Sequence, residues 1–107
     1  MKDSLRQQLE RLSMRLTELD ANLADPAVLS DIKRYRALSR EQAEAAQLVS
    51  LFRRYQQREG DLAAARELLG DPEMADLARD EIAAATADLD RLLAELQSAL
   101  LPRDPDD

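Results

Sequence analysis

Leucines recur at alternating intervals of four and three residues along the first part of the chain. Such spacing places them on one stripe of a helix, and its repetition over almost three heptads is typical of a coiled-coil seam. We therefore predict a helix over residues 4–22, and Ser4 with Gln7 forms a capping-box pattern at its start. The seam consists of Leu5, Leu9, Leu12, Leu16, Leu19 and Leu23.

A second apolar stripe predicts one long helix over residues 31–69. Its steps of three and four residues hold as far as Phe52, and an extra step of three to Tyr55 then disturbs the register. The stripe consists of Tyr35, Leu38, Gln42, Ala45, Val49, Phe52, Tyr55, Leu62, Ala65 and Leu69.

Two features interrupt the helical pattern of residues 31–69. Gly60 costs a helix about 1 kcal/mol relative to alanine, so we expect a bend at that point. Ser39 with Gln42 is a further possible capping box, which leaves a break near Leu38 as an alternative. We favour one continuous helix with a bend.

Asp-Pro pairs at residues 25–26 and 71–72 predict where helices stop and start. An aspartate caps a helix well, and proline suits the first helical position. The first pair precedes a short helical turn, after which Ser30 and Asp31 are cap candidates for the next helix. Gly70 precedes the second pair, and we predict that it adopts the left-handed conformation that ends many helices.

A third helix is predicted over residues 72–100, with a seam of alanine, isoleucine and leucine. Three helices with short connections predict an all-α fold, either an elongated three-helix bundle or an antiparallel coiled-coil hairpin. We expect one helical domain over residues 1–100 and an acidic, proline-containing exit linker over residues 101–107. The third seam consists of Ala78, Ile82, Ala85, Leu89, Leu92, Leu96 and Ala99, and Leu89, Leu92 and Leu96 are expected to be its most sensitive positions.

Composition argues against an enzyme. The chain has no cysteine and no histidine, so it lacks a thiolate nucleophile, an imidazole base and a Cys/His metal site. It has no glycine-rich phosphate loop either. Carboxylates gather at Asp80, Glu81, Asp88 and Asp90, but no calcium-loop pattern surrounds them, and we interpret them as a solvated face. We expect no catalytic residue, cofactor, metal or small-molecule substrate.

The net charge of −7 is unevenly distributed, because residues 1–58 carry +3 and residues 59–107 carry −10. The second half should repel phosphate, so a contact with nucleic acid would have to use the first half. No stretch of apolar residues is long enough to span a membrane, and no secretory signal opens the chain. We therefore expect a cytoplasmic protein without a membrane partner.

Basic residues gather in two clusters of the second predicted helix. Lys33, Arg34, Arg36 and Arg40 surround Tyr35, and a second group follows at Arg53, Arg54 and Arg58. We favour the interpretation that these side chains are hydrated and pair with the acidic third helix, where exposed pairs contribute about 0–1 kcal/mol each. The alternative is that Lys33, Arg34, Arg36 and Arg40 contact a charged partner.

The sequence resembles the N-terminal domain of the bacterial class I peptide chain release factors, and within them the factor 1 branch more than the factor 2 branch. The resemblance covers essentially the whole chain. One departure is Gln42, where the family often has an aromatic residue. The resemblance rests on Leu23-Ala24-Asp25-Pro26, Ser30-Asp31, Arg34-Tyr35-Arg36-Ala37-Leu38-Ser39-Arg40-Glu41, Asp71-Pro72-Glu73-Met74, Leu77-Ala78-Arg79-Asp80-Glu81 and the segment of residues 100–107.

This resemblance implies a role in stop-codon-dependent translation termination on the ribosome. The family reads the codon with a Pro-x-Thr-type tripeptide and promotes hydrolysis of peptidyl-tRNA with a Gly-Gly-Gln motif, and this sequence has neither. It therefore implies a non-catalytic docking and spacer arm, one domain of a larger factor. The implied partners are the ribosomal stalk base with protein L11 and the class II release-factor GTPase.

Two alternatives come from other functional classes. The seams would also suit a stand-alone coiled-coil adaptor that dimerises, and the solution mass distinguishes that function. A tRNA-binding helical arm, like those that open some aminoacyl-tRNA synthetases, would need a basic face along its length. The charge of −10 over residues 59–107 opposes that function.

Overall fold

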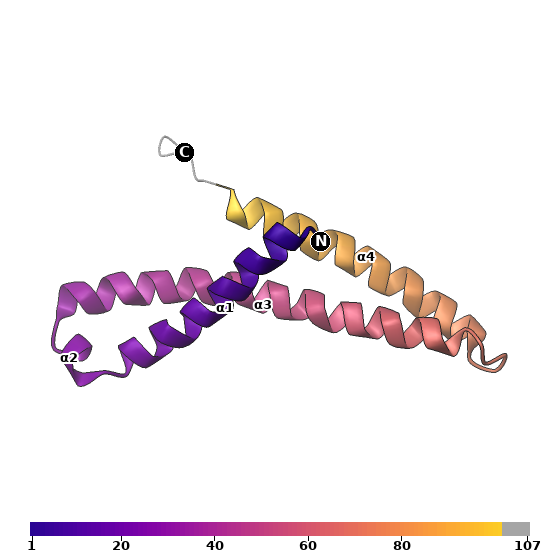
Figure 1. Cartoon of the computed structure of the whole chain (residues 1–107), viewed down its shortest axis with the longest axis horizontal. Coiled ribbons are helices and arrows are strands. Elements are labelled where there is room, and N and C mark those ends of the chain that lie inside the picture. Colours follow the sequence, from indigo (N-terminus) through magenta and orange to yellow (C-terminus); the bar gives the residue numbers. More distant parts are fainter. Residues whose placement is uncertain (102–107) are drawn as a thin grey trace. The chain divides into compact units, whose positions relative to one another are not determined.

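The computed structural model describes residues 1–101 and contains four helices, with no strand within that range. The helices are α1 (Asp3–Leu23), α2 (Pro26–Leu29), α3 (Ile32–Leu68) and α4 (Ala75–Leu100) (Figure 1). The all-α class is therefore confirmed. Of the predicted exit linker, residues 102–107 lie outside the described residues.

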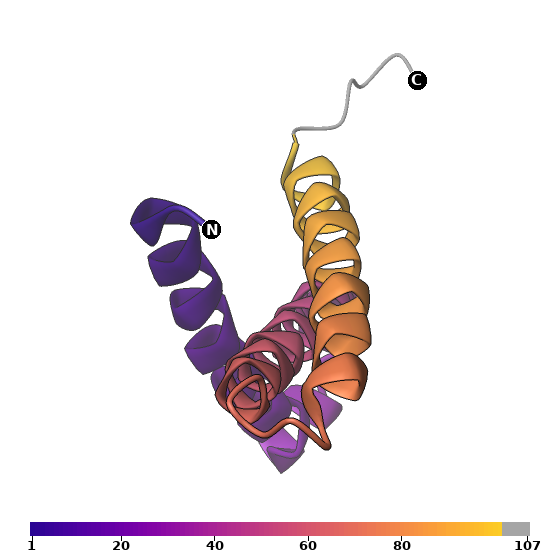
Figure 2. The same ribbon diagram turned by 90° about the vertical axis from the view of Figure 1, so that its right-hand side faces the viewer.

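The chain divides into two compact units, Met1–Ser50 and Leu51–Asp107. In unit 1, α2 joins α1 to the first part of α3. In unit 2, the rest of α3 is joined to α4 by a tight turn, which Figure 2 shows from its end. Each unit is a helical hairpin, and α3 contributes to both.

The predicted seams supply the buried residues. In unit 1 the core cluster is Leu16 and Leu19 of α1 with Ala45 and Val49 of α3. The ends of the second stripe are different, because Tyr35 and Leu69 are exposed. The buried residues of unit 2 include Tyr55, Ala65, Ala78, Ala85, Leu92 and Leu96.

α3 is continuous through both possible interruptions, so the alternative break near Leu38 is wrong. Gly60 lies inside the helix, and the bend expected there stays a prediction. Gln42 occupies a seam position, and its Nε2 donates a hydrogen bond of 3.2 Å to Oδ1 of Asp20 in α1. A polar contact between the helices of unit 1 thus stands where the resemblance led us to expect an aromatic side chain.

Two aspartates cap the helices of unit 1 as predicted. The carboxylate of Asp25 accepts a hydrogen bond from the backbone N–H of Ala27 at 3.0 Å, with Pro26 as the first residue of α2. The carboxylate of Asp31 accepts from the backbone N–H of Arg34 at 3.2 Å. These bonds satisfy backbone donors that a helix start leaves without a partner.

The capping box predicted at Ser4 is wrong. The N-cap of α1 is Lys2, and no side chain donates to or accepts from this end of the helix as a cap. Ser4 lies one residue inside α1, where its backbone is already helical. The helix therefore begins earlier than the capping pattern indicated.

The turn between α3 and α4 also differs from the prediction. No glycine has a positive φ, so Gly70 does not adopt the left-handed conformation. The carboxylate of Asp71 accepts from the backbone N–H of Glu73, and residues 71–74 form turns instead of helix. Because this Asx-type turn consumes the residues after Pro72, α4 begins at Ala75, three residues later than predicted.

No helix within residues 1–101 combines the length and the apolar character that a membrane crossing requires.

Candidate interaction site

The predicted basic contact residues lie at the start of α3. Lys33, Arg34, Arg36 and Arg40 are all exposed, and the cap formed by Asp31 fixes the backbone that carries them. Lys33, Arg36 and Arg40 are separated by three and four residues, so they follow one stripe of the helix over about 10 Å. None of the four forms an ion pair with another residue of unit 1.

Apolar side chains accompany these cations. Leu29 is 53% exposed, Ile32 58% and Tyr35 38%. We call this surface the basic tip, defined by Leu29, Ile32, Lys33, Arg34, Tyr35, Arg36 and Arg40. It combines ammonium and guanidinium donors, which suit phosphate or carboxylate groups, with an aromatic ring and aliphatic side chains that suit an apolar contact. Sequence analysis singled out its cations and missed its exposed Leu29 and Ile32.

The three arginines of the second basic cluster do not form one exposed surface. Arg58 is engaged by carboxylates, whereas Arg53 and Arg54 are exposed. Arg58 Nη1 donates to Asp61 Oδ2 at 2.9 Å and to Glu81 Oε1 at 2.6 Å. Its Nε lies 2.9 Å from Asp88 Oδ2, in an ion pair whose angle does not make a hydrogen bond. Pairing with the acidic third predicted helix, α4, is thus confirmed for Arg58. Arg53 and Arg54 form no ion pair with the described residues 51–101.

This network corrects the interpretation of the carboxylates as a purely solvated face. Asp80 and Asp90 are exposed, but Glu81 and Asp88 are half-buried and contact Arg58. Arg58 lies at a seam spacing between Tyr55 and Leu62, so the sequence held a signal for it. The signal was missed because the stripe was traced from Tyr55 directly to Leu62, without the charged residue between them.

The network shifts two pKa values in unit 2. Hydrogen bonds from Arg58 and then Gln57 lower the pKa of the Asp61 carboxyl. Hydrogen bonds to Asp61 and Glu81 raise the pKa of Arg58. Each shift favours the charged form, so the ion pairs are held together at neutral pH.

An equivalent contact joins α1 to α3 in unit 1. Arg15 donates to both carboxylate oxygens of Glu41, from Nε at 2.7 Å and from Nη2 at 2.9 Å. This bidentate geometry lowers the pKa of Glu41. The hydrogen bonds to Glu41 and Glu18 raise the pKa of Arg15. Both inter-helix ion pairs therefore lie within a hairpin and serve its structure.

Among the described residues, no group of three acidic, histidine or cysteine side chains is placed to hold a metal ion. The contacts in the two hairpins arrange ion pairs between helices, and none of them brings a nucleophile together with a base. The chemistry that the described surface offers is recognition of a partner by charge and apolar contact.

Comparison with known proteins gives a consistent result. The PCRF domain family matches residues 12–107. The chain is 61% identical over 103 residues to the peptide chain release factor 1 of Leptothrix cholodnii. The aligned segment makes up 96% of this chain and 29% of that protein. It is 57% identical over 107 residues to the peptide chain release factor 1 of Paracidovorax citrulli. This aligned segment makes up 100% of this chain and 30% of that protein. The chain thus spans less than a third of the length of these relatives.

Proposed function

Because this chain belongs to the PCRF domain family, we propose that it is the docking and spacer arm of a class I peptide chain release factor. In this function it takes part in stop-codon-dependent translation termination on the ribosome, in the cytoplasm. The arm carries no catalytic residue of its own and sets the position of the groups that read the codon and promote hydrolysis. It is thus a structural and binding element of a termination factor.

The observation that carries this proposal is the similarity along the whole chain to proteins named peptide chain release factor 1. The identity of 57% to the Paracidovorax citrulli protein extends over all 107 residues. Two helical hairpins with ion pairs between their helices also suit a spacer.

We further propose that the arm docks at the ribosomal stalk base, near protein L11, and contacts the class II release-factor GTPase. The basic tip is the surface we assign to the ribosome. Its four cations are exposed and have no acidic partner in unit 1, so they can pair with phosphate without first breaking an ion pair.

An exchange experiment tests the proposed function. The matching segment of the Leptothrix cholodnii factor is replaced by this chain, and peptide release and ribosome binding are measured in a reconstituted translation system. We expect the chimera to work nearly as well as the intact factor, and a factor that lacks the segment to bind the ribosome less tightly. Equal release, affinity and GTPase-stimulated recycling without the segment would show that no arm is needed.

Charge reversal tests the basic tip. In the chimera, Lys33, Arg34, Arg36 and Arg40 are changed to glutamate, and ribosome affinity is measured over a range of salt concentrations. We expect weaker binding and a smaller dependence of log affinity on log salt, because fewer counterions are released. Arg53→Glu with Arg54→Glu is the control for charge reversal outside the tip, and the tip double variant Arg36→Glu with Arg40→Glu matches it in the number of reversed charges. An unchanged salt dependence of the tip variant rejects the assignment.

A further inference from the structure

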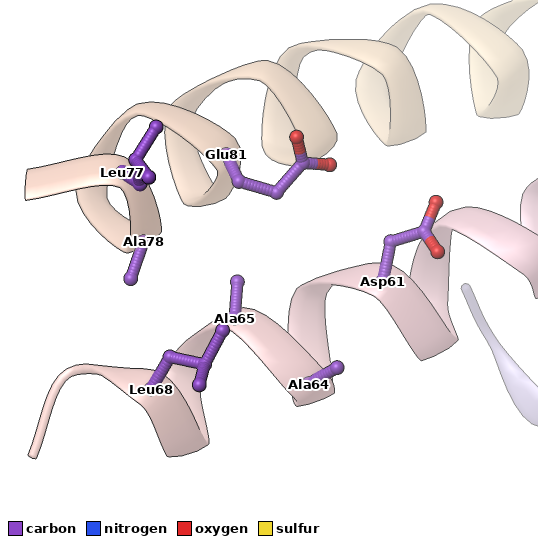
Figure 3. A pocket seen from close by; sticks show the side chains of 7 residues that line it. All are labelled: Asp61, Ala64, Ala65, Leu68, Leu77, Ala78 and Glu81. Carbon is purple, nitrogen blue, oxygen red and sulfur yellow. The ribbon is translucent and has the colours of Figure 1, made fainter. Parts of the chain in front are cut away.

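A groove in unit 2 has no role in the function proposed above. It lies where α3 and α4 approach their connecting turn and has a volume of about 320 Å³. Figure 3 shows Ala65 and Ala78 facing one another across it. Leu68 and Leu77 line the end near the turn, and the Asp61 and Glu81 carboxylates line the other end. We call it the leucine groove.

The leucines of this groove are unusually accessible. Leu68 is 41% exposed and Leu77 63%, and the neighbouring Leu69 is 41% exposed as well. Large apolar side chains gathered at one place on the surface mark a binding site more often than scattered ones do. The alanines explain the hollow between them, because Ala64, Ala65 and Ala78 have no side chain long enough to fill it.

The groove is surrounded by negative charge. Residues 64–81 contain six acidic and two basic side chains, and one of the basic ones, Arg79, is already paired with Asp76. Glu81 uses Oε1 to accept from Arg58, and its Oε2 has no hydrogen-bond partner among residues 51–101. Its side chain is 45% exposed, so this oxygen is open to a cation from outside.

We propose that the leucine groove docks a basic amphipathic helix of a partner protein. One or two large apolar side chains of that helix fill the space between Leu68 and Leu77, and a lysine or arginine one turn away pairs with Glu81. Helix-in-groove recognition uses apolar anchors at such spacing, and opposite charges on the rim steer the helix and set its direction.

Other classes of ligand fit this groove less well. Its volume is at the small end of the range of roughly 300–1,000 Å³ for small-molecule sites, and its only charged groups are two carboxylates that already contact Arg58. Phosphate is repelled by the surrounding acids, which opposes RNA. The inference is independent of the proposed function, because the groove and its charge belong to this chain whatever larger protein contains it.

A peptide titration tests the inference on the whole chain. The probe is a synthetic helical peptide of about four turns with leucines at seam spacing and lysines elsewhere, and its control replaces every lysine by glutamate. We expect the lysine peptide to shift the NMR signals of Ala65, Leu68, Leu77 and Ala78, and the glutamate peptide to bind at least about tenfold more weakly. Shifts outside the groove, or equal binding of both peptides, overturn the proposal.

Two variants with a matched control sharpen this test. Ala64→Phe covers the groove from an exposed position, and Ala63→Phe places the same ring next to it without lining the groove. We expect Ala64→Phe to weaken the lysine peptide about tenfold and Ala63→Phe to leave it unchanged. Leu77→Ser, at an exposed position, provides a second variant with the same expected loss should Ala64→Phe fail to fold. Equal affinities of all variants contradict the inference.

Two further outcomes would assign the groove to another occupant. If the groove signals shift with protein concentration in the absence of peptide, a second copy of the chain fills it and the proposal is wrong. If a single-stranded RNA oligonucleotide produces the same shifts at physiological salt, the charge argument fails and the proposal is equally wrong.

Discussion

Arg58 shows how one polar residue in an apolar seam is made compatible with helix packing. Its side chain is 21% exposed, and three carboxylates surround the guanidinium. Glu81 and Asp88 lie seven residues apart on α4, with the buried Ala85 between them. Arg58 pairs with both acids in the register that α3 and α4 adopt in unit 2.

Removal of Arg58 should destabilise the chain. Arg58→Met keeps most of the apolar stem but leaves half-buried carboxylates without their cation, which costs more than the ion pair contributes. We expect its urea midpoint to fall further than that of Arg91→Met. Arg91 is the matched control, because it also pairs with acids but is 51% exposed. Equal midpoints would show that the network adds nothing to a surface pair.

The ion pairs of Asp61 in unit 2 and of Glu41 in unit 1 make the stability of the chain depend on pH. The pKa values of Asp61 and Glu41 are lowered in the folded chain, so folding is favoured above their ordinary values of 3.8 and 4.5. That contribution is lost as the pH falls through the lowered values. We expect the free energy of unfolding, from urea titrations, to decrease from about pH 6 to about pH 3. Arg58→Met should flatten this dependence and Arg91→Met should not.

At the scale of the helix, α3 continues through Gly60 because its neighbours on both sides supply seam contacts. Tyr55 and Ala65 are buried and lie on either side of the glycine. A glycine costs a helix interior free energy through its greater backbone freedom in the unfolded chain, and packing of the flanking residues offsets that cost. The glycine therefore leaves the helix intact but less stable than it would be with another residue.

Gly60→Ala should stabilise the chain by about 0.5–1 kcal/mol, because a Cβ at this position meets no atom within 4 Å and the helical backbone suits alanine. Thermal unfolding followed by circular dichroism measures the change. Gly70→Ala is the control, since it lies in the turn outside α3, and its effect should be smaller. A loss of stability in Gly60→Ala would mean that the glycine is needed for a bend.

The seam leucines of α4 should differ in sensitivity according to their burial. Leu92 is 1% exposed, and we expect Leu92→Ala to lower the free energy of unfolding by about 2–5 kcal/mol. Leu89 is only half-buried, so Leu89→Ala should lower the free energy of unfolding by less. The exposed Leu77→Ala should change stability by no more than about 0.5 kcal/mol. Urea unfolding of the three variants checks the order, and equal losses at positions 77 and 92 would contradict it.

At the scale of the whole molecule, charge separates the two units. Unit 1 has equal numbers of acidic and basic residues, whereas unit 2 carries the whole net charge of −7. The basic tip and the leucine groove accordingly offer opposite chemistry, one for anionic partners and one for cationic ones.

The chain should be monomeric, because the seams of α1 and α4 already bury leucines within the chain that a coiled-coil dimer would need. These are Leu9, Leu16, Leu19, Leu92 and Leu96. Light scattering is expected to give a mass near 12.0 kDa at every protein concentration tested. A mass that doubles as concentration rises would instead favour the dimerising adaptor considered from the sequence.

Prediction from the sequence succeeded where local chemistry and periodicity decide. The seam of α1 and the caps at Asp25 and Asp31 depend on residues close together in the chain, and the structure contains them. Prediction was wrong at Ser4 and Gly70, where a local pattern competes with others of similar free energy. The basic tip was recognised by its cations, but the exposure of Leu29 and Ile32 depends on which apolar side chains the fold leaves uncovered.

The amino-acid sequence by itself determined that this protein is built from helices, which stripe of each helix is apolar, and that no histidine or cysteine chemistry is available to it. Those properties follow from spacing and composition, which act over a few residues. Only the tertiary structure decided that Arg58 gathers acids from α3 and α4, and that Leu68 and Leu77 line an open groove. Both depend on the register between the consecutive helices α3 and α4, which is set by the packing of many side chains together.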